Sequence, residues 1–318
     1  MVIRSVKYKD ITAYEVETLK WSALFSAEYG GKMLSLVYKQ TGRQILEETI
    51  GEVYKKPFYD GVYIDAECSA FDDMFPTIDR MICEQYPWVG TVCPDHGEVY
   101  ALPWQSETDG DSLHLWVYSP RFCYRLDKWV RDEKGAIKVD YCASNLGPFP
   151  FDFIYAAHCM LKAENGARLE LPFVEGSLCT TTFNTNAPEL GSYGNKITWP
   201  TQDGFDLTYT YPKSRDLTFK VYFDQRISDG MCSYHYPDGL RLDVSFSNDT
   251  LPYFALWTNL GNFKNMYNIA IEPCSGSFDR PDLARKHGQY SVLEGNGKYS
   301  WFIAFDMQED KVIGYALK

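Results

Sequence analysis

Residues 240–246 read LRLDVSF, a stretch in which apolar and polar side chains alternate at every position. Successive side chains of a β-strand point to opposite faces of a sheet, so this alternation is typical of a half-buried strand. A helix would instead place its apolar residues three and four positions apart. The turn sequence Pro-Asp-Gly at 237–239 precedes the stretch and marks its beginning. The stretch therefore predicts one strand of an antiparallel sheet.

The same alternation recurs along the chain on both sides of this stretch, at 113–118, 137–143, 217–223 and 299–305. Turn signals rich in Gly separate such segments, at 28–31, 132–135, 164–166 and 295–297. Helical signal is scarce, and its best candidate is the polar stretch 282–287. Many strands with few short helices predict an all-β fold, a large sandwich or barrel that is mostly antiparallel. Because no linker or repeat divides the chain, we expect a single domain over residues 1–318.

Aromatic residues are abundant, with 24 Tyr, 19 Phe and 8 Trp, or 16% of the 318 residues. Such residues favour strands, and most of them are expected to fill the core. An aromatic face can also stack on the apolar C–H face of a pyranose while polar groups bind the hydroxyls. The composition is therefore compatible with a sugar-binding protein.

The formal net charge of −12 argues against a nucleic-acid partner, because an acidic surface repels a phosphate backbone. The nine cysteines show no CxxC or other metal-ligand spacing. The first residues contain no apolar signal core, and no stretch approaches the ~20 apolar residues that cross a bilayer. We therefore expect a reduced, cytoplasmic protein that does not bind a membrane.

Two of the five histidines stand in unusual surroundings. His96 lies in the loop PDHGE at 94–98, where acidic neighbours are expected to orient the imidazole and fix its tautomer. His158 follows the aromatic run FPFDFIY at 149–155, a position that suits either core packing or an aromatic-walled pocket. The remaining histidines are interpreted as structural: His114, His235 and His287.

Glu272 is a carboxylate in the apolar, strand-like run NIAIEP at 268–273. Burying a carboxylate is costly unless the group is hydrogen-bonded or functional. Partial desolvation raises the pKa of a carboxylate and makes it a better base. Glu272 is therefore a candidate general base.

At these residues the sequence resembles the aldose 1-epimerase (hexose mutarotase) family, from about residue 20 onward. The resemblance is carried by an ordered series of stretches: AEYGGKMLSL at 27–36, FDDMFPT at 71–77, PDHGE at 94–98, Asn145 with His158, LPYFALW at 251–257, IEP at 271–273 and LEG at 293–295. FDDMFPT before PDHGE is similar to a bacterial branch of the family, in which Trp-Asp-Glu-Met-Phe-Pro precedes Asp-His-Gly-Glu. The resemblance implies a galactose mutarotase-like β-supersandwich with a concave sugar site.

The resemblance also implies an activity, the interconversion of the α and β anomers of a hexose or related free sugar without a cofactor. In this interpretation Glu272 is the base on the O1 hydroxyl and His158 is the acid toward the ring oxygen. Acid and base must then face one sugar-sized gap. The expected substrate-binding residues are His96, Arg80, Asp72, Asp95 and Trp257.

The sequence departs from the family pattern in two places. Phe71 and Asp73 stand where the bacterial branch has Trp and Glu. The arginine that contacts sugar hydroxyls in many members has no certain match, and Arg80 is the candidate. The mid-chain aspartate of the family is left open among Asp203, Asp206 and Asp224.

Three alternatives remain open at the level of sequence. The chain could bind or sense a sugar without turnover on the same fold. It could act on a hexose 6-phosphate, which needs clustered Arg or Lys at the pocket rim, and no such cluster is seen near the signature residues. A weaker alternative is a divalent cation held by the carboxylates of Asp72, Asp73, Asp95 and Glu98. No metal site is predicted. The expected partner is a small-molecule sugar, and the expected state is a monomer or weak homodimer.

Overall fold

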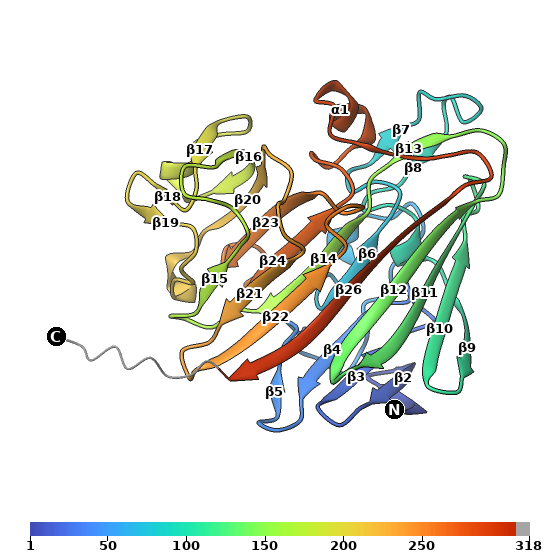
Figure 1. Cartoon of the computed structure of the whole chain (residues 1–318), viewed down its shortest axis with the longest axis horizontal. Helices are drawn as coiled ribbons and strands as arrows, with labels where there is room; N and C mark the ends of the chain where they lie inside the picture. Colours follow the sequence, from blue (N-terminus) through green and yellow to red (C-terminus); the bar gives the residue numbers. More distant parts are fainter. Residues whose placement is uncertain (310–318) are drawn as a thin grey trace.

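The computed structural model describes residues 1–309, and nearly all of its regular structure is antiparallel β-sheet (Figure 1). Every pairing between its strands is antiparallel, as the alternating segments predict. None of the helices in this part of the chain is long and apolar enough to cross a membrane. The prediction of an all-β, mostly antiparallel fold with few short helices is thus confirmed.

The larger sheet has twelve strands and runs from the N-terminal hairpins to the 196–198 segment, which lie at opposite sides of the molecule in Figure 1. Its spatial order is β1 (Val2–Tyr8), β2 (Ile11–Glu17), β3 (Trp21–Phe25), β4 (Met33–Tyr38), β6 (Phe71–Met74), β14 (Ala156–Lys162), β24 (Tyr267–Cys274), β23 (Tyr253–Leu260), β20 (Thr218–Phe223), β16 (Leu178–Thr185) and β17 (Lys196–Thr198). The short strand β5 (Arg43–Gln44) pairs with β4. Strands from all parts of the sequence therefore meet at the centre of this sheet.

The second sheet has eight strands, and the long β26 lies near its middle, in dark red in Figure 1. Its order is β15 (Arg168–Glu170), β21 (Met231–His235), β22 (Leu240–Phe246), β26 (Lys298–Glu309), β12 (Ala136–Asn145), β11 (Tyr124–Glu133), β10 (Ser112–Tyr118) and β9 (Gln105–Asp109). The stretch LRLDVSF is β22, and four of its seven residues are buried in strict alternation.

Short elements complete the described chain. Three two-stranded ribbons pair β13 (Phe151–Phe153) with β25 (Ser291–Leu293), β18 (Thr201–Gln202) with β19 (Phe205–Asp206), and β7 (Met81–Ile82) with β8 (Val92–Cys93). The helix α1 (Pro281–Lys286) falls on the stretch predicted as helical, and the remaining helical turns are 3₁₀: η1 (Tyr63–Asp65), η2 (Val99–Ala101), η3 (Pro188–Leu190) and η4 (Lys213–Arg215). α1 lies beside β7, β8 and β13 at the top of Figure 1.

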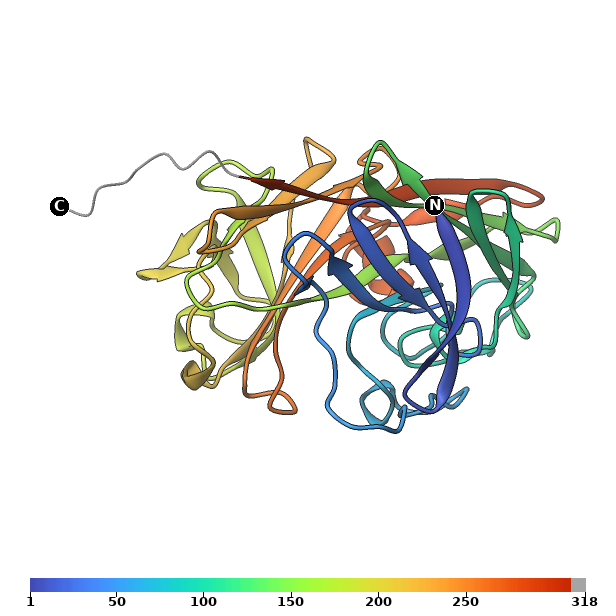
Figure 2. The same cartoon turned by 90° about the horizontal axis from the view of Figure 1, so that it is seen from below.

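The hydrophobic core lies between the inner faces of the two sheets, whose backbone is seen from below in Figure 2. Phe71 of β6 contacts Phe305 of β26 edge to face, with ring centroids 6.0 Å apart. Between the sheets, Lys128 Nζ of β11 lies 2.7 Å from Asp73 Oδ2 of β6, and both side chains are buried. A charged group in this layer is therefore matched by a partner, as burial requires.

The central strands of the larger sheet are buried on both faces, which differs from the half-buried pattern expected of them. All six residues of β20 are buried, although Thr218, Lys220 and Tyr222 alternate with apolar residues. One face packs in the core between the sheets, and the other carries loops, α1 and a cavity. The polar residues of these strands therefore line an interior site and not an open surface.

Candidate functional site

The register of the larger sheet places residues from five strands in one row. Tyr222 of β20 pairs with Ala255 of β23, which pairs with Glu272 of β24. The residue pairs between β14 and β24 on either side of this position set His158 opposite Glu272. His158 in turn pairs with Asp72 of β6. Residues opposite one another in a sheet share a face, so these side chains project from the same side. Glu272 and His158, separated by 114 positions, become neighbours in this way.

A cavity of about 320 Å³ covers this face of the sheet. Its polar lining includes His96, His158, Lys220, Asn259, Asn268, Glu272 and Asp279. Its aromatic lining consists of Tyr63, Phe183, Tyr193, Trp257, Phe263 and Phe278. Apolar walls with a few convergent polar groups are typical of sites for small molecules, and the volume suits one the size of a sugar.

Glu272 lies at the floor of the cavity and is fully buried, with 0% of its surface exposed. Lys220 Nζ is 3.0 Å from Oε2 in an ion pair, yet neither carboxylate oxygen has a partner with good hydrogen-bond geometry in residues 1–309. Burial raises the pKa of Glu272, against the opposing charge of Lys220. A buried carboxylate with free acceptor positions is suited to accept a proton from a ligand.

His158 is buried beside Glu272, and its Nε2 lies 3.9 Å from Glu272 Oε1. Burial lowers the pKa of His158 well below its usual value, and the charges of His96 and Lys220 add to this effect. The other ring nitrogen, Nδ1, lies 3.0 Å from the hydroxyl of Tyr63. Nε2 is therefore the nitrogen that lies near Glu272.

His96 completes the histidine pair on the cavity wall. Its ring is 5.5 Å from that of His158, centroid to centroid, at an angle of 81°. His96 has a left-handed backbone, with φ of 58°, and Gly97 follows it with φ of 75°. A Cβ on Gly97 would meet the backbone of Phe75 at 2.3 Å, so glycine is required for this loop to approach the sheet. Asp95 Oδ1 lies 2.9 Å from His96 Nδ1 and holds the ring in place.

Lys220 is the cation of the cavity, and it contacts two carboxylates. Its Nζ lies 2.7 Å from Asp279 Oδ1 and 3.0 Å from Glu272 Oε2. Although burial opposes the charged form, Asp279 and Glu272 raise the pKa of Lys220. The hydroxyl of Tyr222 donates a second hydrogen bond to Asp279 at 2.7 Å. The positive charge is thereby shared between two anions.

Trp257 belongs to an aromatic group at the cavity wall. Its ring lies 5.6 Å from that of Phe183 and 5.7 Å from that of Phe263, centroid to centroid. Its indole nitrogen donates to Asn268 Oδ1 at 3.2 Å, which fixes the ring orientation. The group adds apolar surface to a cavity that also holds polar side chains, a combination typical of small-molecule sites.

The structure brings four of the predicted site residues to the cavity, namely Glu272, His158, His96 and Trp257. The other three lie outside its lining. Arg80 is exposed, and the cation beside the carboxylates is Lys220 instead. Asp95 supports His96 from behind, and Asp72 is buried behind Tyr63. Their predicted contacts with a sugar thus find no support in this geometry.

The carboxylates considered for a divalent cation do not converge. Strand alternation sends Asp72 and Asp73 to opposite faces of β6, where they pair with Lys32 and Lys128. Glu98 accepts hydrogen bonds from Ser119 and Tyr124 at 2.6 and 2.7 Å and also bonds Tyr59. Among the described residues, no three His, Cys, Asp or Glu form a group that could hold a metal ion.

Three residues of the site were not found from the sequence: Tyr63, Lys220 and Asp279. Lys220 stands at a polar position of an alternating strand, which normally faces solvent. Tyr63 begins the 3₁₀ turn η1 and Asp279 lies in a loop, and neither belongs to a recognisable motif. None of the aspartates left open, Asp203, Asp206 and Asp224, lines the cavity, whereas Asp279 and Asp79 do.

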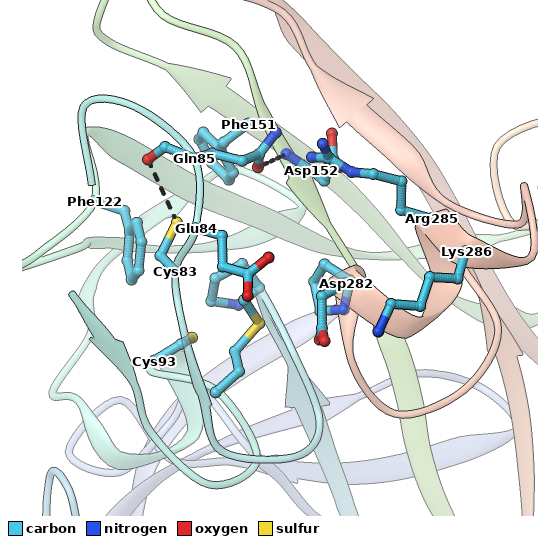
Figure 3. A pocket seen from close by; sticks show the side chains of 13 residues that line it. Cys83, Glu84, Gln85, Cys93, Phe122, Phe151, Asp152, Asp282, Arg285 and Lys286 are labelled. Carbon is cyan, nitrogen blue, oxygen red and sulfur yellow. Dashed lines mark hydrogen bonds and ion pairs between the residues drawn. The ribbon is translucent and has the colours of Figure 1, made fainter. Parts of the chain in front are cut away.

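A second cavity, of about 250 Å³, lies next to α1 and is drawn in Figure 3. Phe122 and Phe151 contribute aromatic surface, and the thiols of Cys83 and Cys93 border it. Burial raises the pKa of both thiols, so neither has the thiolate character of a reactive cysteine. Arg285 of α1 reaches Asp152 and forms an ion pair with it (Figure 3).

Neither a protein-family model nor a curated protein matches the chain. The chain does match solved structures. A provisionally assigned aldose 1-epimerase from Escherichia coli K12 aligns over 93% of this chain and 99% of its own, with a TM-score of 0.67 and 15% identity. Galactose mutarotase-like proteins from Clostridium acetobutylicum and Lactobacillus casei both give a TM-score of 0.66, at 11% and 15% identity, and cover 97% and 93% of this chain and 98% and 100% of theirs.

The chain has the galactose mutarotase-like fold. The fold expected from the family resemblance is thus confirmed. At identities of 11–15% the likeness concerns the fold alone, and the activity has to be argued from the site.

Proposed function

We propose that the protein is an aldose 1-epimerase, which interconverts the α and β anomers of a hexose or related free sugar. The observation that carries the proposal is the pairing of Glu272 and His158 at the floor of a sugar-sized cavity, with Oε1 and Nε2 3.9 Å apart. Mutarotation needs one base and one acid at two oxygens of the same carbon. Two groups this close, on one face of the site, can reach both oxygens at once.

The reaction begins when Glu272 takes the proton of the O1 hydroxyl. The C1–O5 bond breaks as the C1=O1 bond forms, and O5 takes a proton from His158 Nε2. The free aldehyde turns about its C1–C2 bond, and O5 then attacks the other face of C1. On reclosure O5 returns its proton to His158 Nε2 and Glu272 returns its proton to O1, so both residues regain their starting state and no cofactor or co-reactant is consumed.

The electrostatics of the pair favour a single shared proton. Burial penalises both the carboxylate of Glu272 and the imidazolium of His158, and it moves their pKa values toward each other. Groups this close titrate as a coupled pair. The form with one proton is the reactive one, so kcat/KM should depend on pH as a bell.

The charges of the cavity favour a neutral sugar. Among the lining residues, all of which lie in the described part of the chain, Lys220 is the only Lys or Arg. Its charge is already matched by Glu272 and Asp279. A hexose phosphate would bring a dianion to this site without a free cation to receive it. We therefore place free sugars ahead of hexose 6-phosphates.

Polarimetry of freshly dissolved α-glucose and α-galactose with the purified protein tests the proposal. Catalysis is expected with at least one free sugar and not with the 6-phosphate. A protein that binds a hexose, as followed by calorimetry, but never accelerates its mutarotation would be a sugar-binding protein on the same fold. Faster turnover of the 6-phosphate would contradict our choice of substrate class.

A further inference from the structure

A chain of three side chains leads away from the cavity behind His158. The Tyr63 hydroxyl lies 3.0 Å from His158 Nδ1 and 2.8 Å from Asp72 Oδ2. All three side chains are buried. Asp72 does not line the cavity, so its path to the reacting atoms runs through Tyr63 and His158.

The hydrogens of this chain can be counted. A tyrosine hydroxyl has one hydrogen to donate and lone pairs with which to accept. Of the two groups next to the Tyr63 hydroxyl, Asp72 as a carboxylate is the stronger acceptor. The hydroxyl hydrogen of Tyr63 therefore goes to Asp72. Two lone pairs facing each other at 3.0 Å would repel, so Nδ1 of His158 must carry a hydrogen and donate it to Tyr63.

Lys32 favours the anionic form of Asp72, the last residue of this hydrogen-bonded series. Its Nζ lies 2.7 Å from Asp72 Oδ2, and the lysine is itself buried. Burial raises the pKa of Asp72, whereas Lys32 and the hydroxyl of Tyr63 both favour the carboxylate. A charged acceptor is thereby present for the tyrosine hydrogen.

The tyrosine ring is held so firmly that its hydroxyl cannot turn away. His96 stacks on one face of Tyr63, with centroids 3.9 Å apart and planes at 8°. Tyr100 meets the ring at an angle of 74°, with centroids 5.2 Å apart. The backbone N–H of Tyr63 donates to Asp95 Oδ2 at 2.8 Å. Tyr63 thus holds the ring of His96 in the cavity wall and places its own hydroxyl behind His158.

We propose that Tyr63 and Asp72 are positioning residues that fix a proton on Nδ1 of His158 and leave Nε2 as the nitrogen that exchanges a proton with the sugar. After His158 has protonated O5, the neutral ring keeps its Nδ1–H and exposes a lone pair at Nε2. The same nitrogen can then take the proton back when the ring closes. The role in turnover rests on the proposed function, but the tautomer is a property of the free protein.

Nitrogen-15 NMR of imidazole-labelled protein without sugar tests the tautomer directly. With only five histidines, the His158 signals are assigned by their loss in His158→Asn. Above about pH 8, where an ordinary imidazole is neutral, we expect Nδ1 protonated and Nε2 bare. Tyr63→Phe should shift neutral His158 toward the Nε2–H form. A wild-type ring protonated on Nε2 would overturn the proposal.

Kinetics provide the second arm, with Tyr100→Phe as the matched control. That variant removes a hydroxyl from a ring packed on Tyr63 but leaves the hydrogen-bonded chain complete. Tyr63→Phe and Asp72→Asn should each lower kcat about tenfold or more with little change in KM, while Tyr100→Phe stays near wild type. Equal losses in all three variants would indicate a merely structural role and overturn the proposal.

The two arms separate the inference from the proposed function. If the wild-type protein accelerates no sugar, the proposed function fails, and the NMR arm still decides the tautomer. If the protein is active while Tyr63→Phe keeps both the tautomer and kcat, the positioning role fails and the function stands.

Discussion

The two cavities share α1 as part of their walls but differ in how far their charged groups are removed from solvent. In the cavity over the sheet, which Leu283 of α1 lines, Glu272 and its ion-pair partner Lys220 are both buried. In the second cavity Asp152 is paired with Arg285 (Figure 3) and Asp282 with Arg280, and both arginines reach solvent. Buried charges are more costly than charges in contact with water even when they are paired, so their retention points to chemistry at the first cavity. Size alone does not separate the two.

The largest expected effect is the loss of the base. Glu272→Gln keeps the size of the side chain but cannot accept the O1 proton, so kcat should fall by roughly 10²-fold or more. Binding of the sugar should survive, because the lost interaction matters mainly in the transition state. Polarimetry gives the rate and calorimetry the affinity. Full activity in this variant would remove Glu272 from its role even if the protein is an epimerase.

A smaller effect is expected from Lys220→Met, which removes the charge beside the pair. Lys220 lowers the pKa values of Glu272 and His158, so its loss should raise both. The bell in kcat/KM should then move as a whole to higher pH. Lys220→Arg is the control, since it keeps the charge. A profile that moves to lower pH in Lys220→Met would contradict the electrostatic account.

The smallest effect is expected in the second cavity. Arg285→Gln breaks the ion pair with Asp152, but Arg285 is about half exposed, and such pairs contribute ~1 kcal/mol or less. Its kcat and KM should remain within about twofold of wild type, and thermal unfolding should change little. A large fall in kcat would mean that the second cavity communicates with the first through α1 and would contradict the assignment of the chemistry to the first cavity alone.

The fold could be predicted because its signal is local and repeated. Alternation at 240–246 and 299–305 became β22 and β26, and the polar stretch 282–287 overlaps α1. Each strand carries its own period-two pattern, which no tertiary contact has to supply. The pattern was misleading for β20, where the polar face is covered by other segments. Covering of this kind depends on how distant parts of the chain pack.

The sequence by itself determined the strands, the loop that carries His96, and a carboxylate at Glu272 that is too costly to bury without a role. Only the tertiary structure decided which side chains meet there. Register across β20, β23, β24 and β14 places Lys220 and His158 next to Glu272, and the segment around Tyr63 closes over them. Register depends on pairing between strands that are distant in sequence, and a shift by one residue would turn every side chain to the other face. Asp72, predicted to contact sugar, shares a face of the sheet with His158, but packing of the Tyr63 segment over the sheet leaves it outside the cavity.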